Sequence, residues 1–274
     1  MWEHPLRMRE LKIVLDVARY RLARLEMANL VAAIAIMIAL RMSFAEIMVR
    51  GIFGLLLNLL VYLNNDWFDL DDDLATSTRD RAKTQYLAQN RDAAVRAQLG
   101  LLALLGGFAF TWGDGLPWVL VTGAGICAVY SAYLKHRPFT DIAAMMIWGV
   151  AMPAVAVPPG SAEGWSLLWQ LALFSGVFET IQVLRDLDID RHRGIPTTAV
   201  VLGRVKTQWL ARGMMLAAGA YAAWCFHPAL MLPPLVAAVL PIPAVGLTNY
   251  WHRIRLLLGP TLLIECVMIW LHTG

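Results

Sequence analysis

Nine apolar stretches, separated by shorter polar connections, constrain this chain more than any other feature. A helix that crosses a bilayer needs about 20 mostly apolar residues, and several of the stretches approach or reach that length. They lie at about 25–40, 45–65, 93–112, 116–134, 141–158, 165–185, 207–226, 229–248 and 256–272. The sequence therefore predicts an all-α, polytopic membrane protein. Prolines interrupt the eighth stretch, which is compatible with two half-segments.

Composition supports one membrane-embedded unit. Of the 274 residues, 59% are hydrophobic and 16% are charged, whereas about 25% are charged in an ordinary soluble domain. The mean hydropathy is +0.57. These values argue against a soluble enzyme, a disordered chain and a secreted scaffold, and favour a single transmembrane domain over residues 1–274. The three cysteines fall within apolar stretches without CxxC spacing, so neither a disulfide framework nor a thiolate metal site is expected.

Basic residues concentrate in alternate connections and predict the orientation. Residues 1–24 interleave Lys and Arg with apolar side chains, which predicts a basic amphipathic segment on the cytoplasmic surface; a merely solvated basic tail is the alternative. The connections after the second, fourth, sixth and eighth stretches are basic. By the positive-inside rule, the N-terminus is cytoplasmic and the C-terminus lies outside an inner or cell membrane. The net charge of +3 is thus a topology signal, and no nucleic-acid partner is expected.

Two acidic clusters end the second and the sixth stretch. Each contains an Asp-x3-Asp pair, Asp69 with Asp73 and Asp186 with Asp190. Positions i and i+4 share one helix face, so each pair places two carboxylates side by side at the cytoplasmic mouth of a helix. Mg²⁺ typically takes one or two protein carboxylates and completes its shell with water and substrate phosphates. The two clusters predict a diphosphate site bridged by Mg²⁺. The alternative is that both are the solvated acidic starts of loops, which would be a sufficient explanation for one such cluster but not for two.

Positive groups lie near both clusters. Arg81 follows the first cluster, Arg185 precedes the second, and Tyr130 and Lys135 end the fourth stretch on the same side. Guanidinium and ammonium groups stabilise a leaving diphosphate. Each of these basic residues alone is equally compatible with a role in topology.

At these residues the sequence resembles the UbiA superfamily of intramembrane prenyltransferases. Residues 65–73 match its signature N-D-x-x-D-x-x-x-D. The second signature, D-x-x-x-D-x-x-x-G-x-x-T followed by L-G, is matched from Asp186 to Gly203. Tyr130-Ser131 and Leu134-Lys135 look like the Y-S-x-x-L-K segment. The resemblance runs from about residue 20 to the end of the chain.

The resemblance implies nine transmembrane helices around a central cavity, with helical caps on the cytoplasmic side. It implies an isoprenyl diphosphate as substrate, usually a lipophilic acceptor, and Mg²⁺ as cofactor. The positions that match metal and diphosphate ligands are Asn65, Asp69, Asp73, Asp186 and Asp190, and those that match diphosphate contacts are Arg81, Tyr130 and Lys135. The chain departs from the family pattern at Ala82, where a proline is usual, and in the first span, where an Arg-Pro pair is missing.

Glu179 is a further candidate inside the sixth stretch. It lies seven residues before Asp186, and therefore on the same helix face two turns deeper. A carboxylate within a span is costly and is a functional hypothesis by default. It could deprotonate or orient an acceptor or quench a cation; the alternative is a carboxylate paired within the bundle. Glu265 has a similar status in the ninth stretch.

The leading hypothesis is an enzyme that ionises an isoprenyl diphosphate with Mg²⁺ and transfers the prenyl group to a lipophilic or aromatic acceptor. The alternative is a terpene cyclase, in which a double bond of the same substrate attacks the cation. Both need a cavity that excludes water, and aromatic faces can stabilise the cation. A transporter is disfavoured because its site would more naturally lie at the membrane midplane.

Overall fold

The computed structural model describes residues 4–24, 26–76 and 81–273, and this part of the chain is helical with connecting loops and no strand. The predicted all-α class is therefore confirmed for it. The α-helices are α1 (His4–Ala23), α2 (Ala28–Ala39), α3 (Phe44–Phe68), α4 (Leu70–Thr76), α5 (Arg81–Gln89), α6 (Arg91–Trp112), α7 (Leu116–Ala132), α8 (Thr140–Ala151), α9 (Ala162–Arg193), α10 (Thr198–Cys225), α11 (Leu232–Val239) and α12 (Leu247–His272). Short 3₁₀ helices are η1 (Leu134–His136), η2 (Pro153–Ala156) and η3 (Pro228–Met231).

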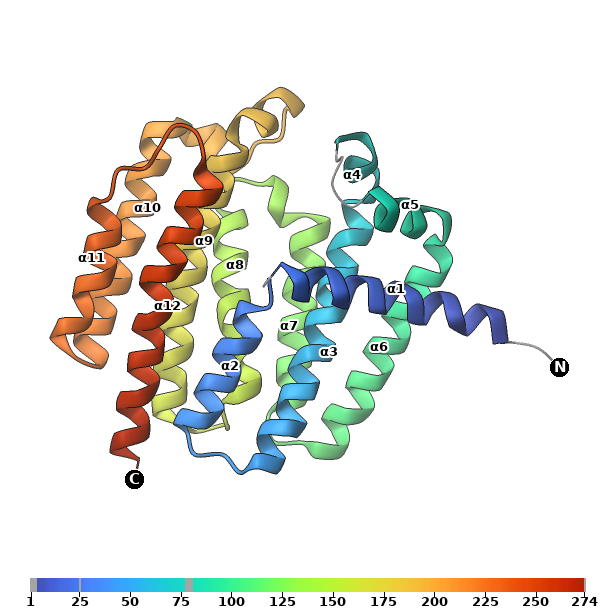
Figure 1. Ribbon diagram of the computed structural model, residues 1–274, viewed down its shortest axis with the longest axis horizontal. Coiled ribbons are helices and arrows are strands. Elements are labelled where there is room, and N and C mark those ends of the chain that lie inside the picture. Colours follow the sequence, from blue (N-terminus) through green and yellow to red (C-terminus); the bar gives the residue numbers. More distant parts are fainter. Residues whose placement is uncertain (1–3, 25, 77–80, 274) are drawn as a thin grey trace.

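The long helices run side by side in one bundle (Figure 1). In one half, α9 packs against α8, α10 and α12, and in the other, α3 packs against α2, α6 and α7. The close approach of α8 to α9 depends on small residues, because a methyl group at Gly149 would overlap Ser175 and the backbone of Leu171. Such contacts are typical of helix packing in membranes.

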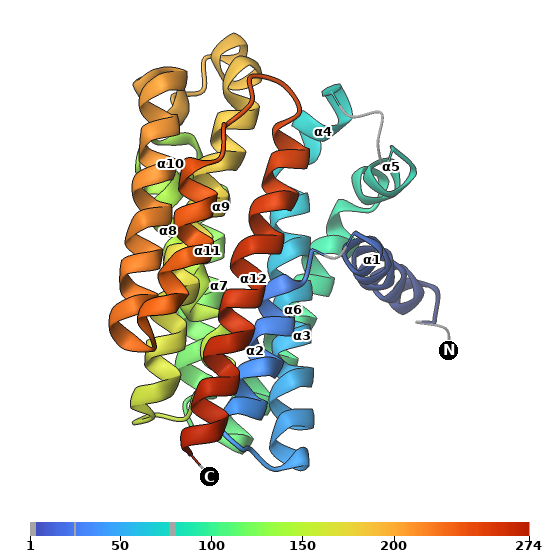
Figure 2. The same ribbon diagram turned by 60° about the vertical axis from the view of Figure 1, so that its left-hand side comes forward.

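Two helices of the bundle end at the same end of the molecule and carry the acidic clusters there (Figures 1 and 2). Helix α3 begins with a capping box, in which the Ser43 hydroxyl accepts from the Glu46 backbone N–H and the Glu46 carboxylate accepts from the Ser43 backbone N–H. Helix α9 begins at an N-cap serine and ends at Gly194, whose φ of +70° is the left-handed conformation that stops a helix. Each acidic cluster lies at the C-terminal end of its helix.

Four helices, α3, α6, α9 and α12, are long and apolar enough to cross a membrane, and there are up to five if the bent pair Met8–Ala23 and Ala28–Ala39 is one span. The other apolar stretches are helical at least in part, but α7, α8 and α11 are shorter. Helix α10 is long but polar in its first turns, where it carries Arg204 and Lys206. Nine spans therefore stay a prediction. The eighth stretch forms η3 and α11 and leaves the helix before Pro241.

The described part of the predicted amphipathic segment forms α1, which crosses the flank of the bundle against α6 and α3 (Figure 2). One face buries Ile13 and Val17, and the other exposes Leu11 and Leu15. Its position at a membrane surface stays a prediction, and residues 1–3 lie outside the described residues.

A buried ion-pair network fastens α1 and α5 to the end of α3. The Asp66 carboxylate accepts from Arg21 Nη2 of α1 at 2.5 Å and from Lys83 Nζ of α5 at 2.8 Å. Arg21 also pairs with Glu26 and lies over the Tyr62 ring. The Arg-Pro pair usual in the first span is missing from this chain, but an arginine of the preceding helix α1 contacts the acidic motif at Asp66.

We expect Asp66→Ala to destabilise the protein by about 3 kcal/mol or more, because it removes the buried carboxylate that two largely buried cations share, and Arg21 then keeps only its pair with Glu26. The side chains of Arg21 and Lys83 are only 16% and 14% exposed. Thermal unfolding of the purified protein in detergent measures this effect. Asp16→Ala on α1, whose carboxylate pairs with the exposed Lys12, is the control and should change stability little. Equal melting temperatures for the two variants would contradict the network's role.

Candidate active site

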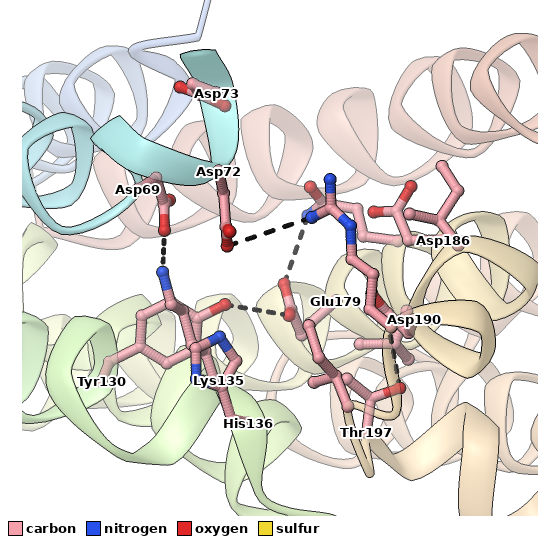
Figure 3. Close-up of a pocket in the computed structure, with 15 residues that line it drawn as sticks. Asp69, Asp72, Asp73, Tyr130, Lys135, His136, Glu179, Asp186, Asp190 and Thr197 are labelled. Carbon is pink, nitrogen blue, oxygen red and sulfur yellow. Dashed lines mark hydrogen bonds and ion pairs between the residues drawn. The ribbon is translucent and has the colours of Figure 1, made fainter. Parts of the chain in front are cut away.

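A pocket of about 300 Å³ opens between the ends of α3 and α9 (Figure 3). Side chains from both acidic clusters line it, together with residues from α7, η1 and the start of the α9–α10 connection. Its carboxyl groups are Asp69, Asp72, Asp73, Glu179, Asp186 and Asp190. Its other polar side chains are Tyr130, Lys135, His136, Gln182, Arg193 and Thr197. The two clusters that the sequence singles out therefore share one cavity.

The first cluster is shaped by the break between α3 and α4. Asp69 is the C-cap of α3, and Asp73 follows one turn later in α4. Asn65 Nδ2 donates to Asp69 Oδ2 at 3.0 Å, and Ser131 Oγ donates to Asn65 Oδ1 at 3.4 Å. Lys135 Nζ forms an ion pair with the other oxygen of Asp69. Asn65 thus orients Asp69 from behind and does not itself line the pocket.

The second cluster occupies the last two turns of α9. Asp186 and Asp190 face the pocket, and Thr197 Oγ1 donates to Asp190 Oδ2 at 3.2 Å. The adjacent Thr198 is held by Asp141 of α8, whose carboxylate accepts from the Thr198 backbone N–H at 2.8 Å. Asp141 is fully buried and also bonds the Thr198 hydroxyl. These bonds fix the start of α10 and thereby the hydroxyl that orients Asp190.

Glu179 lies deeper in the same pocket, as the helix spacing predicts (Figure 3). Its side chain is buried, the Tyr130 hydroxyl donates to Oε1 at 3.3 Å, and Gln182 Nε2 donates to Oε2 at 3.3 Å. Both partners are neutral. The carboxyl group is therefore hydrogen-bonded to neutral groups, and it faces the cavity in which a substrate would lie.

Burial shifts the ionisation of the residues at the mouth of the pocket. Burial raises the pKa of Asp73, and the nearby Asp66 carboxylate adds to this shift. Burial lowers the pKa of Lys135 to about 8. Burial and the neighbouring Lys135 charge lower the pKa of His136. The six carboxyl groups that line the pocket favour a bound cation, because a cation offsets the repulsion among the carboxylates.

The donor set fits Mg²⁺ when substrate oxygens complete the coordination. Within residues 4–24, 26–76 and 81–273, no three His, Cys, Asp or Glu side chains are close enough to form a metal site by themselves. Mg²⁺ does not require such a cage, since it commonly uses one or two carboxylates with water and phosphates. Asp69, Asp73, Asp186 and Asp190 offer carboxylates from opposite sides of one pocket, so their assignment as metal ligands stays a prediction that the donor chemistry supports.

Two predicted basic residues do not line the pocket. Arg81 begins α5 and is exposed. The guanidinium of Arg185 donates to the carboxylate of its neighbour Asp186 at 2.9 and 2.7 Å and is also outside the lining set. Sequence reasoning missed His136 as a lining residue. Arg193, one of the basic residues that surround the second cluster, also lines the pocket, and it lies seven residues after Asp186 and hence on the same helix face.

Comparison with known proteins gives consistent results. The model of the UbiA prenyltransferase family matches residues 28–257. A lycopene elongase/hydratase of Haloferax volcanii is 30% identical over 209 residues, which cover 71% of this chain and 66% of that protein. The match thus spans just under two thirds of the Haloferax protein. A protein of the same name from Haloarcula japonica is 28% identical, with 71% and 68% covered.

Solved structures share the fold. A digeranylgeranylglyceryl phosphate synthase structure has a TM-score of 0.75 at 14% identity, covering 95% of this chain and 98% of that one. A UbiA homologue from Archaeoglobus fulgidus, bound to GPP and Mg²⁺, has a TM-score of 0.67 at 14% identity, with 95% and 96% covered. At this level of identity the likeness concerns the arrangement of helices alone.

Proposed function

Since the chain belongs to the UbiA prenyltransferase family, we propose that it is a Mg²⁺-dependent membrane enzyme that ionises an isoprenyl diphosphate and transfers the prenyl group to a lipophilic acceptor. The observation that carries this proposal is the meeting of Asp69, Asp73, Asp186 and Asp190 in one pocket with Lys135. The bound structures of the Archaeoglobus homologue, with GPP or DMAPP and Mg²⁺, support the substrate class.

The mouth of the pocket would bind the diphosphate. Asp69, Asp73, Asp186 and Asp190 would hold Mg²⁺, with Asn65 keeping Asp69 in place. Bound Mg²⁺ neutralises diphosphate charge and stabilises it as a leaving group. Lys135 adds positive charge from the η1 side, and the Tyr130 hydroxyl donates to Glu179 in the same pocket. The apolar surroundings of the prenyl chain would keep water from the allyl cation.

Glu179 would receive the proton that the transfer step releases. When C1 of the prenyl cation forms a bond with an unsaturated carbon of the acceptor, the positive charge passes to the acceptor. Loss of an adjacent proton from the acceptor to the Glu179 carboxylate restores a neutral product. The relatives are named lycopene elongase/hydratase, and this name favours a long unsaturated hydrocarbon as the acceptor class. The same proton acceptor would serve an aromatic acceptor.

The test is an incubation of purified protein with Mg²⁺ and dimethylallyl, geranyl or geranylgeranyl diphosphate, with and without lycopene. Released diphosphate and lipid products are measured together. We expect diphosphate release that requires both Mg²⁺ and the acceptor, and a product enlarged by one prenyl unit. A cyclic hydrocarbon formed without acceptor would replace transfer by cyclisation, and no diphosphate release from any of these substrates would overturn the proposal.

We further propose nine spans, with the pocket and N-terminus cytoplasmic and the C-terminus outside. The helical content of all nine stretches and the basic connections at the pocket end support this topology. We expect protease added to intact cells to remove an epitope tag from the C-terminus and to leave an N-terminal tag untouched. The reverse result would exclude this orientation, and both tags on one side would exclude an odd number of spans.

A further inference from the structure

Arg193 occupies a position on α9 that points it toward the diphosphate subsite. It follows Asp186 by seven residues and Asp190 by three, so the three side chains share one face of the helix. Gly194 ends the helix directly after it, which places Arg193 at the rim of the pocket. Arg193 is the only arginine among the described residues that line this pocket.

The partner of Arg193 lies across the mouth on the other acidic cluster. Arg193 Nη1 is 3.9 Å from Asp72 Oδ2, and the two side chains are 31% and 60% exposed. This contact is long and open to solvent, and exposed ion pairs of this kind contribute little to stability. Lys135, by contrast, is paired with Asp69 and is only 14% exposed. The Arg193 guanidinium is therefore the pocket cation that can leave its carboxylate most easily.

A guanidinium matches a phosphate group better than it matches a distant carboxylate. Its planar N–H donors bind two phosphate oxygens at once, and such bidentate contacts are among the strong hydrogen bonds of proteins. A diphosphate held between the two acidic clusters would lie between Arg193 and Asp72, because both residues line that space. Binding there would also separate the weak ion pair.

We propose that Arg193 is a diphosphate-binding residue that rests on Asp72 while the pocket is empty and exchanges Asp72 for the diphosphate when substrate binds. Asp72 is then a competitor of the substrate and limits its affinity. The inference rests on the proposed function for the identity of the ligand. It adds a pair of residues that are not among the four aspartates of the two signature motifs. It also predicts opposite effects for the two partners.

The opposite effects separate this exchange from two simpler roles. If the pair were a static latch between α4 and α9, removal of either partner would weaken binding. If Asp72 acted only as one more negative charge, its removal would strengthen binding equally with and without Arg193. Under exchange, most of the gain in binding from removal of Asp72 requires Arg193.

The experiment measures the binding of inorganic pyrophosphate, in the presence of Mg²⁺, to the purified full-length protein by calorimetry. We expect Arg193→Gln to raise the Kd about tenfold or more and Arg193→Lys to give an intermediate value, because lysine keeps the charge without the fork. We expect Asp72→Asn to lower the Kd about threefold or more, and to have less than about half of that effect in the Arg193→Gln background.

The matched control is the ion pair Asp71 with Arg91, which is also exposed, also includes an α4 carboxylate, and does not line the pocket. Asp71→Asn and Arg91→Gln should leave the Kd within about twofold. Weaker binding in Asp72→Asn, an equal gain in both backgrounds, or no loss in Arg193→Gln would each overturn the exchange. Pyrophosphate binding requires no turnover, so the pattern can hold even if no prenyl diphosphate reacts, which would count against the proposed function alone.

Discussion

Asp69→Asn and Asp186→Asn are each expected to lower kcat/KM for the isoprenyl diphosphate by about 10³-fold or more. Both carboxylates face the pocket, one from the end of α3 and one from α9. Asparagine has nearly the same shape as aspartate but no negative charge, so it weakens Mg²⁺ binding with little effect on packing. Steady-state kinetics over a range of Mg²⁺ concentrations should also show that more metal is needed for half-maximal rate.

Each acidic cluster contains its own control for this prediction. Asp71 and Asp188 lie within the clusters, but their side chains are 78% and 67% exposed and pair with Arg91 and Arg204, outside the pocket lining. Asp71→Asn and Asp188→Asn should therefore keep kcat/KM within about threefold. Retained turnover in both Asp69→Asn and Asp186→Asn, or equal losses in the controls, would overturn the assignment of the metal ligands.

The contrast between these aspartates shows why the carboxylate site was predictable from sequence. Helical periodicity alone distinguishes Asp186 and Asp190 from Asp188, because residues four apart share a face and the residue between them points elsewhere. The same spacing predicted that Glu179 lies on the pocket face. These residues belong to, or directly adjoin, long regular helices, whose geometry is nearly independent of the rest of the fold.

The predicted Lys135 lines the pocket, whereas Arg81 and Arg185 do not, because their positions depend on a chain break and on the direction of a long side chain. Arg81 follows the α3–α4 break, and no periodic pattern relates its direction to that of Asp69. Arg185 is next to a pocket residue, and adjacent helical positions point about 100° apart. The ion pair between Arg21 of α1 and Asp66 of α3 could not be predicted either, because it is a tertiary contact between segments that share no periodicity. Hydropathy likewise located the apolar stretches but not the lengths of the helices, since prolines and loops shorten α8 and α11.

Glu179→Gln is expected to lower kcat by about 10²-fold or more, because a positioned general base typically contributes a factor of this size. Glutamine preserves the shape of the side chain but cannot accept the proton from the prenylated acceptor. Pyrophosphate binding with Mg²⁺ should stay close to that of the parent protein, because Glu179 lies below the mouth. The loss should therefore affect kcat and leave diphosphate affinity unchanged, whereas Asp69→Asn should affect both.

Glu265→Gln is the matched control, since it removes a second buried carboxyl group from a helix that is long and apolar enough to cross a membrane. Glu265 is fully buried, has no hydrogen-bond partner within the described residues and does not line the pocket. If Glu179 acted only through packing or burial cost, the two substitutions would change kcat alike. If it helped to hold Mg²⁺, pyrophosphate binding would weaken in Glu179→Gln. A kcat loss confined to Glu179→Gln, with binding intact, excludes both of these roles and is the result expected for proton transfer.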